Sequence, residues 1–328
     1  MLDLNFIFEN LEIPVKENEI SVSEIEGCSY ICKDKNHNVS FAILHTEQEI
    51  EKWPRDRKTP SLLFSSGKEI TLRISGEDRP IDGRISIITC GDERLLTPFY
   101  AMVNAAVSDT SLIRIMGKDP IELWNFLEEF YECFSKAKRT TFSKRKAIGL
   151  WGELSKLREG EITEGILESW KGPENYVHDF ISEDTAVDIK TTTRKNRIHN
   201  IKHDQLFDDS IPDMFIQSFM ITKNHSSGKS IDEVIGEISE KLIPKLRLEF
   251  VRKLGLIGYN HHGEHAECSV KYSERSGSRL FAVETIPHIS DEHIPDGIIS
   301  MEYSITLDNL APIPDHESQA IDRKLRGD

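Results

Sequence analysis

The chain has 328 residues and a formal net charge of −15 at pH 7, which excludes a protein that is basic over its whole surface, such as a general nucleic-acid coat. Its hydrophobic content of 38% suffices for a sizeable core, and its length favours two domains. No stretch approaches the roughly 18 unbroken apolar residues of a membrane span, and the acidic N-terminus lacks a signal peptide's layout, so we expect a soluble cytoplasmic protein.

Residues 1–118 have the pattern of a β-rich domain. Apolar runs at Cys28–Cys32 and Val39–His45 flank the polar turn "KDKNHN", and "RISIITC" alternates before "GDE" turns the chain. A short helix is expected at Tyr100–Val107. Because this part contains no catalytic constellation, we expect it to be an accessory domain or to bind a partner.

The five cysteines are an odd number spread along the chain, which favours reduced core thiols over a disulfide framework. Cys28 and Cys32 lie near His37, and three histidines between residues 261 and 265 lie near Cys268. Neither spacing is that of a standard zinc finger, so we favour core thiols and a polar loop over zinc sites.

The elements after residue 118 begin with two helices. Asp119 has the position of an N-cap, with Pro120 as the first helical residue and Glu122 at the capping-box position. A basic link then leads to a helix at Lys144–Arg158, whose leucines recur at helical spacing. Glu153 lies at the edge of this apolar stripe, where it either reaches water and pairs with a lysine or points into a site.

A short helix at Glu161–Trp170 ends at "KGP", where glycine and proline stop it. Strands are expected after it at Tyr176–Ile181, Ala186–Thr192 and Met214–Thr222. The first two strands are apolar on both faces apart from a few charged positions. Such strands belong at the centre of a covered sheet.

Three charged residues, Asp179, Asp188 and Lys190, interrupt the first two of these strands. If the strands form a hairpin that turns at Glu183 and Asp184, Asp179 lies directly opposite Asp188, and Lys190 shares the face of Asp188. Opposed carboxylates about 5 Å apart repel each other unless they share a cation. The alternative is a buried ion pair between the lysine and one acid, which would leave surplus negative charge.

A divalent metal gives this arrangement a coherent chemistry. Carboxylates suit Mg²⁺, and a metal-bound water is a better nucleophile towards a phosphodiester than free water. Lys190 would orient or help to deprotonate that water and offset charge on the phosphate. Glu153 would add a ligand directly or through another group, and Gln205 would position water or phosphate.

The remainder of the chain mixes helical and strand patterns. Helical spacing is found at Ile231–Leu242 and again up to Leu254, and a hairpin is expected around "ERSGS" at 274–278. Residues 299–307 alternate between apolar and polar, as in a half-exposed strand. The polar segment 312–328 is expected to be mobile.

Positive charge is concentrated in two stretches of this acidic chain. Residues 136–146 carry six cations and residues 189–203 carry five, with no acid in either. Such stretches are either solvated loops and helix ends or a local footprint for a polyanion. The candidates for contacts with a DNA backbone are Lys144, Arg145, Lys146, Arg194, Lys195, Arg197 and Lys202.

The central motifs resemble those of a known family. Asp179, eight intervening residues and "DIK" at Asp188–Lys190 look like the D…(D/E)xK signature of the PD-(D/E)XK nuclease superfamily. The stretches "IGLWGELSKL", "WKGP", "HDF" and "HNIKHDQL" are similar to a branch of it whose members tend to be encoded beside bacterial restriction-modification and phage-defence genes. The sequence departs from the common pattern at His178, where proline is usual, and at Asp188, where glutamate is commoner.

The resemblance implies an α/β (α+β) fold with a restriction-endonuclease-like core, in which helices flank a mixed central sheet. We place this core at residues 119–311, between the β-rich domain at 1–118 and a polar tail at 312–328. The implied metal is Mg²⁺ or Mn²⁺. The implied site consists of Asp179, Asp188, Ile189 and Glu153 around the metal, with Lys190 and Gln205 as further catalytic residues.

The favoured function is that of a Mg²⁺-dependent endodeoxyribonuclease in a restriction or phage-defence system. One alternative is a catalytically silent nuclease-fold subunit that binds DNA or serves as a scaffold. Another is an interaction subunit that binds a defence-system protein through residues 1–118. The resemblance also implies a homodimer, because cutting both strands with such a core usually takes two active sites.

Overall fold

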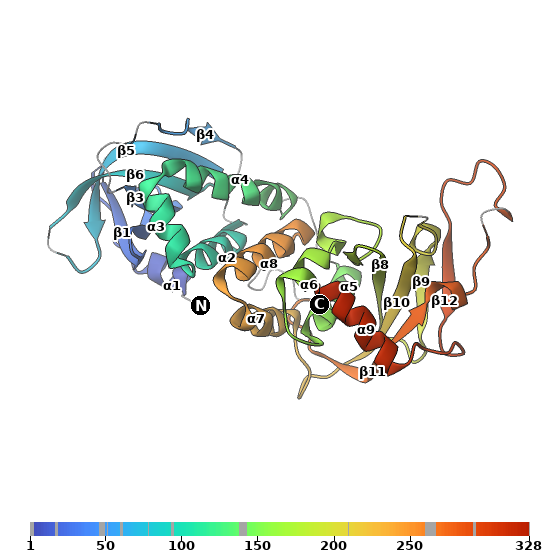
Figure 1. Cartoon of the computed structure of the whole chain (residues 1–328). Helices are drawn as coiled ribbons and strands as arrows, with labels where there is room; N and C mark the ends of the chain where they lie inside the picture. The colour runs from blue at the N-terminus through green and yellow to red at the C-terminus, as the bar shows by residue number, and fades with distance from the viewer. Residues whose placement is uncertain are drawn as a thin grey trace. The chain divides into compact units, whose positions relative to one another are not determined.

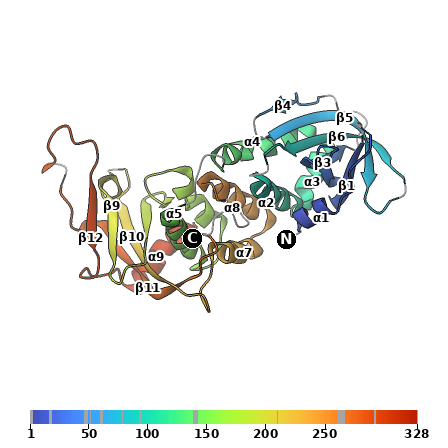
Figure 2. The same ribbon diagram turned by 180° about the vertical axis from the view of Figure 1, so that it is seen from behind.

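The fold of the chain is given by a computed structural model (Figures 1 and 2). It describes residues 3–327 except 17–18, 46–49, 51, 60–61, 78, 93–94, 138–142, 209, 260–266 and 291–292. The chain divides into two compact units, Met1–Thr141 with Ile243–His262, and Phe142–Leu242 with Gly263–Asp328. The boundary predicted at residue 118 does not coincide with this division.

The first unit contains a six-stranded sheet that is closed on itself. Its strands are β1 (Glu19–Glu26), β2 (Ser29–Lys33), β3 (Val39–His45), β4 (Arg57–Lys58), β5 (Leu62–Ile74) and β6 (Ile81–Cys90). The order is β1-β2-β3-β6-β5-β4, and β1 also pairs with β5 in parallel, so five strands form a barrel. Apolar side chains from these strands, including Val22, Cys32 and Ile85, make a buried cluster of their own.

Helices pack against one side of this sheet (Figure 1). They are α1 (Leu4–Glu9), α2 (Leu96–Val107), α3 (Thr110–Lys118), α4 (Pro120–Ala137) and α8 (Pro244–Ile257). Asp119 accepts a hydrogen bond from the N–H of Ile121 at 2.8 Å, as expected for a residue that caps α4. Helices α4 and α8 are extensively packed against each other. Residues 243–262 therefore belong to the first unit, although in the sequence they lie between two segments of the second unit.

The second unit is built on a mixed sheet in the order β11-β10-β8-β7. Its strands are β7 (Phe180–Ser182), β8 (Thr185–Thr192), β10 (Asp213–Lys223) and β11 (Tyr272–Ala282). The pair β8–β10 is parallel, and the other two pairs are antiparallel. Four helices belong to the described part of this unit, α5 (Lys144–Arg158), α6 (Glu164–Ser169), α7 (Ile231–Lys241) and α9 (Asp315–Arg326).

The hairpin of β7 and β8 has the predicted register. Phe180 pairs with Val187 and Ser182 with Thr185, so the turn lies at Glu183 and Asp184. The first strand is shorter than predicted and begins at Phe180. This is because the carbonyl of Asp179 accepts the N–H groups of residues 171 and 172 at 2.7 and 3.0 Å, which pairs it with the turn after α6.

The segment around "ERSGS" is not the turn of a hairpin, in contrast to the prediction. It lies within the single strand β11, which pairs with β10 along its length. The register shifts between Ser218 and Met220 and again before Ile221, so bulges accommodate the glycine and serines. Two further short strands, β9 (Ile198–Lys202) and β12 (Glu302–Thr306), pair with each other. Only β12 was predicted from the sequence.

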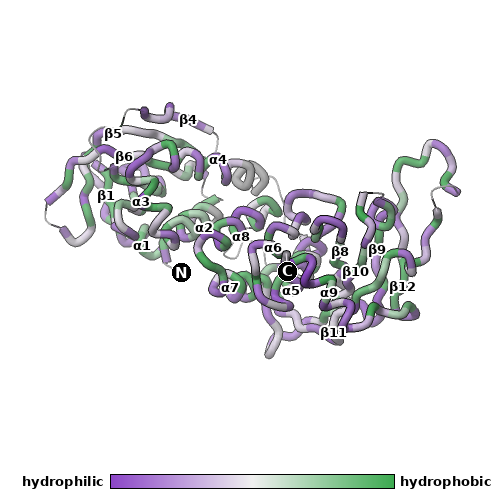
Figure 3. The backbone as a smooth tube through the Cα atoms, in the orientation of Figure 1, coloured by the Kyte–Doolittle hydropathy of each residue, from purple (hydrophilic) through white to green (hydrophobic). Residues whose placement is uncertain are grey.

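The C-terminal segment is a helix and not a mobile tail. Although α9 is largely hydrophilic (Figure 3), Ile321 and Leu325 are buried. The helix packs on α6, where Gly165 approaches the carbonyl oxygen of Arg326 so closely that a Cβ would lie 2.2 Å from it. Lys156 from α5 forms an ion pair with Asp322. These contacts hold the helix in place, although its polar sequence alone does not predict that it packs against the rest of the unit.

The cysteines of the described residues agree with the expectation of free thiols. Cys32, Cys90 and Cys268 are buried and Cys28 is partly buried, all without a disulfide. The histidines at 261–265 lie outside the described residues. Among the residues described, every helix is too short or too polar to span a bilayer.

Candidate active site

The candidate site lies where α5 packs against β8 and the start of β7. Ser143 caps α5 by accepting a hydrogen bond from the N–H of Lys146 at 3.3 Å. Gly152 then allows the helix to approach β8, because a Cβ there would lie 1.9 Å from Oγ1 of Thr191. This close approach brings the next residue, Glu153, to the charged positions of the sheet.

The Glu153 carboxylate lies beside Asp179 and is not directed at open solvent. Nε1 of Trp170 donates a hydrogen bond to Glu153 Oε2 at 2.8 Å. A Cβ at Gly172 would lie 2.9 Å from that oxygen and 3.1 Å from Asp179 Oδ1. The two carboxylates therefore border one small space that only a glycine leaves open.

Asp179 is fixed against the strand that carries the other charged residues. Its Oδ2 accepts the N–H of Ile189 at 2.7 Å. The carbonyl of a strand residue points to the same side as its N–H, so Ile189 also directs its carbonyl towards this edge of β8. The β7–β8 ladder ends at Phe180, so Asp179 continues its register without being paired in it.

Asp188 is the most deeply buried acid of the site, with 1% of its surface exposed. Its Oδ2 lies 2.9 Å from His178 Nδ1. Its Oδ1 accepts a hydrogen bond from Gln205 Nε2 at 2.9 Å and lies 3.8 Å from Lys190 Nζ. Both carboxylate oxygens are thus held in place by neighbouring side chains.

Gln205 connects the lysine with this acid. Lys190 Nζ donates to Gln205 Oε1 at 2.7 Å, and the same oxygen accepts the N–H of Lys202 at 3.2 Å. With its amide nitrogen on Asp188, Gln205 has a single orientation that satisfies both partners. The Lys190 side chain keeps 14% of its surface exposed.

Burial, and then neighbouring negative charge, raises the pKa of two carboxyls in the site. Desolvation raises the pKa of Asp179 well above its usual range, and the charges of Glu153 and Asp188 raise it further. Desolvation also raises the pKa of Glu153, against the hydrogen bond from Trp170 and the charge of Lys190. Burial is the larger cause of both shifts, and a cation among these oxygens would offset the part that comes from the neighbouring carboxylates.

The donor set fits a hard divalent cation that keeps several waters. No group of three or more His, Cys, Asp or Glu side chains arranged to hold a metal ion is found in the described parts of the chain. The candidate ligands are instead two carboxylates, Asp179 and Asp188, with the main-chain carbonyl of Ile189 and Glu153 beside them. Mg²⁺ is commonly held by one or two carboxylates and completes its octahedron with water.

The predicted DNA contacts divide into two groups. The exposed ones are Lys144, Arg145, Lys146, Arg194, Lys195 and Lys202. Arg197 is not available to DNA, which corrects its prediction. Its side chain is buried and donates to Ser218, Ser276 and the carbonyl of Gly277 at 2.6–3.0 Å. It therefore ties the β9 region to β10 and β11.

His178 was not predicted as a site residue. It stands where proline is usual in the family that the sequence resembles. In the structure it is almost fully buried and hydrogen-bonded to Asp188. The available signal was its place beside Asp179 in "HDF", but a neighbour in sequence does not reveal a contact with Asp188.

Comparisons with known proteins give one match. The model of the family described as "Putative PD-(D/E)XK family member, (DUF4420)" matches residues 4–308, a range that includes every residue of the site. No curated protein matches the chain, and no solved structure does.

Proposed function

The chain belongs to this PD-(D/E)XK family, and on that premise we propose that it is a metal-dependent DNA endonuclease. The observation that carries the proposal is the linked set of Asp179, Asp188, Gln205 and Lys190 on one edge of β8. We further propose that the mixed sheet β11-β10-β8-β7 with α5 is a restriction-endonuclease-like core.

Each residue of the site has a separate task in phosphodiester hydrolysis. Asp179, Asp188 and the Ile189 carbonyl would hold Mg²⁺ or Mn²⁺, with Glu153 close enough to support the same ion. The ion, when bound, supplies a water of lowered pKa and positive charge near the phosphate. Lys190 would donate from its ammonium to the attacking water or to a phosphate oxygen. Gln205 keeps that ammonium aimed by accepting its hydrogen bond.

Exposed cations near the site support binding of the DNA backbone. Arg194 and Lys195 come two and three residues after the end of β8, and Lys202 ends β9 close to Gln205. Contacts of this kind position a duplex without reading its sequence. We propose a restriction or phage-defence setting in the cytoplasm, with a homodimer and defence-system proteins as partners. Support for that setting comes from the sequence motifs alone, and a plaque assay with the gene and its neighbours would test it.

The test of the reaction is cleavage of DNA by the purified chain with Mg²⁺ or Mn²⁺. Linear, nicked, branched and single-stranded forms are supplied in parallel. Asp188→Asn and Lys190→Ala should abolish cutting while the circular dichroism spectrum stays unchanged. Glu168→Gln is a matched control, because this acid is exposed on α6, outside the site. Undiminished cutting by Asp188→Asn would contradict the proposal.

The second candidate is a nuclease-fold subunit that binds DNA without cutting it. The observation that favours it is that both carboxylate oxygens of Asp188 already have protein partners. This candidate predicts salt-dependent DNA binding that Asp188→Asn leaves unchanged and that charge reversal at Arg194 and Lys195 weakens. It also predicts no cutting with either metal by the wild-type chain.

A further inference from the structure

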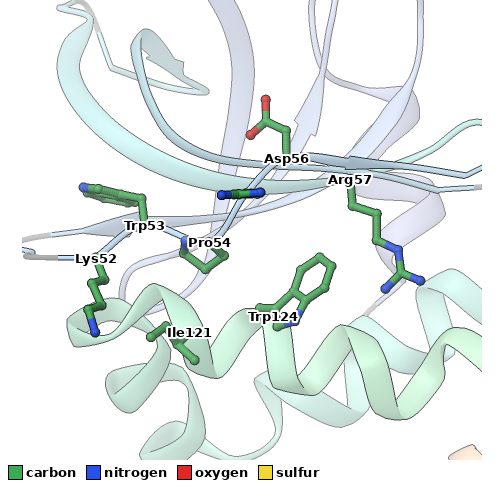
Figure 4. A pocket seen from close by; sticks show the side chains of 8 residues that line it. Lys52, Trp53, Pro54, Asp56, Arg57, Ile121 and Trp124 are labelled. Carbon is green, nitrogen blue, oxygen red and sulfur yellow. The ribbon is translucent and has the colours of Figure 1, made fainter.

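An open groove of about 740 Å³ lies in the first unit, and none of the proposed active-site residues lines it (Figure 4). We call it the tryptophan groove, after its lining residues Trp53 and Trp124. Lys52, Arg55 and Arg57 bring cations to it, and Ile121 adds an apolar side chain. These residues come from the segment that leads into β4, from the first residue of β4 and from the start of α4.

Both indole rings are held in place by the fold. Gly67 has a φ of +65° and leaves room for Trp53, since a Cβ there would lie 2.8 Å from the ring. Trp53 also meets the ring of His45 edge-on at 5.1 Å. Trp124 meets Phe64 in the same manner at 5.1 Å. Rings that are already ordered lose little conformational entropy when a flat ligand stacks on them.

The rings are only partly buried although they are well supported. Ile121 and Trp124 are three residues apart on α4, so they share one face of the helix. In Figure 4 this face lies across the groove from Trp53 and Pro54. The groove therefore offers aromatic and apolar surface from two sides.

The charge of the groove is positive in a strongly acidic protein. The one acid in its lining, Asp56, is paired with Lys68 at 2.7 Å and accepts the N–H of Ser66 at 3.1 Å. Arg57 forms an ion pair with Glu128 and stacks over Trp124 at 5.4 Å. Within the described residues, Lys52 and Arg55 have neither an ion pair nor a hydrogen-bond partner, so their charges are free to meet an anion.

We infer that the tryptophan groove binds an unpaired nucleotide of a DNA strand. A base stacks on an indole ring, and the phosphates on either side lie near Lys52 and Arg55. The bases of an intact duplex are stacked on each other, so their faces are not accessible to the rings. Base–aromatic stacking accepts any sequence, and adjacent cations follow the backbone.

The volume and the charge narrow the choice of ligand. The volume of about 740 Å³ lies within the roughly 300–1,000 Å³ that is usual for small-ligand pockets, which suits one or two nucleotides. A proline-rich peptide would use the aromatic rings but would not need the free cations. The choice of DNA over RNA rests on the proposed function, whereas the stacking itself requires neither the metal nor Lys190.

The test is fluorescence anisotropy of a labelled oligothymidine of about 12 nucleotides, within the site sizes of comparable stacking proteins. The full chain is used in EDTA, so that binding is measured without cutting. A duplex of the same length and an oligouridine serve as parallel ligands. Binding that survives in a chain without nuclease activity would support the groove while it contradicts the proposed function.

Trp53→Leu and Trp124→Leu should each weaken oligothymidine binding roughly 5- to 150-fold, because leucine keeps apolar volume but cannot stack. Trp124→Phe should restore most of the affinity. Phe6→Leu is the matched control, since Phe6 is an aromatic residue with 66% of its surface exposed elsewhere in the same unit. Thermal unfolding of every variant verifies that it is folded.

The double variant Lys52→Glu with Arg55→Glu should also weaken binding and lower the slope of log K against log salt by roughly 1.4, for two lost phosphate contacts. Arg79→Glu with Arg114→Glu changes the net charge equally at exposed positions outside the groove and should have no such effect.

Three results would overturn the inference. Folded tryptophan variants could bind oligothymidine as tightly as the wild type. They could lose duplex and single-strand affinity equally, which would indicate general attraction of polyanions. Oligothymidine could fail to bind while a proline-rich peptide binds. An equal effect on oligouridine would support the stacking site and show that it accepts RNA as well as DNA.

Discussion

Replacement of Gly152 by alanine should separate α5 from β8, and a second glycine of the same helix provides its control. A Cβ at Gly152 would lie 1.9 Å from Oγ1 of Thr191 and 3.0 Å from Cγ2 of Ile189. A Cβ at Gly149 meets nothing within 4 Å. Both variants gain the helix propensity of alanine, about 1 kcal/mol, so this contribution cancels when they are compared.

The difference between the two variants therefore measures the clash. Overpacking of a close contact typically costs about 1–3 kcal/mol. Gly149→Ala should be as stable as the wild type or more so, and Gly152→Ala should have a free energy of unfolding lower than that of Gly149→Ala by this amount. Urea denaturation followed by circular dichroism measures both values.

The same comparison reports on the active site. If α5 withdraws, Glu153 moves away from Asp179, and a displacement of about 1 Å can lower a catalytic rate by 10²-fold. Gly152→Ala should lose most of the DNA cleavage, and Gly149→Ala should keep it. Adding Thr191→Ala removes the nearest atom and should recover part of both losses. Equal denaturation midpoints for Gly149→Ala and Gly152→Ala would refute the reasoning.

Three further predictions follow from individual contacts. Burial lowers the pKa of His199 to about 4. Only the unfolded chain then binds this proton between about pH 6.5 and 4, so stability falls by about 3 kcal/mol as the pH decreases through that range. When chemical denaturation is measured across this pH range, the free energy of unfolding of His199→Gln should depend less steeply on pH than that of the wild type. Arg197→Lys should lower the free energy of unfolding by about 1.5–3 kcal/mol, because lysine cannot make all the buried hydrogen bonds, while Arg194→Lys stays within about 0.5 kcal/mol. Equal melting temperatures for the two arginine variants would argue against a structural role for Arg197. Mn²⁺ at about 100 times its Kd should raise the free energy of unfolding of the wild type by about 2.7 kcal/mol, and EDTA should reverse this stabilisation. Stabilisation of Asp188→Asn to the same extent would mean that the ion binds elsewhere.

Local sequence patterns were enough to predict several helices and strands. Helix α5 has the predicted bounds, Lys144–Arg158, because its apolar spacing lies within the segment itself. The register of the β7–β8 hairpin could also be predicted, since two strands joined by a short turn leave few ways to pair. That register brings Asp179 near Asp188 and fixes Lys190 on the face of Asp188.

Contacts between distant residues were decided only by the tertiary structure. Arg197 had the sequence context of an exposed cation, but Ser276 and Gly277, about 80 residues later, enclose it. The polar C-terminal segment forms a packed helix because it contacts α6 and forms an ion pair with Lys156. The sequence determined which residue types occupy each strand and helix, since periodicity and turns are local. Packing determined which of these charges are buried, paired or free, because that depends on neighbours that no local pattern specifies.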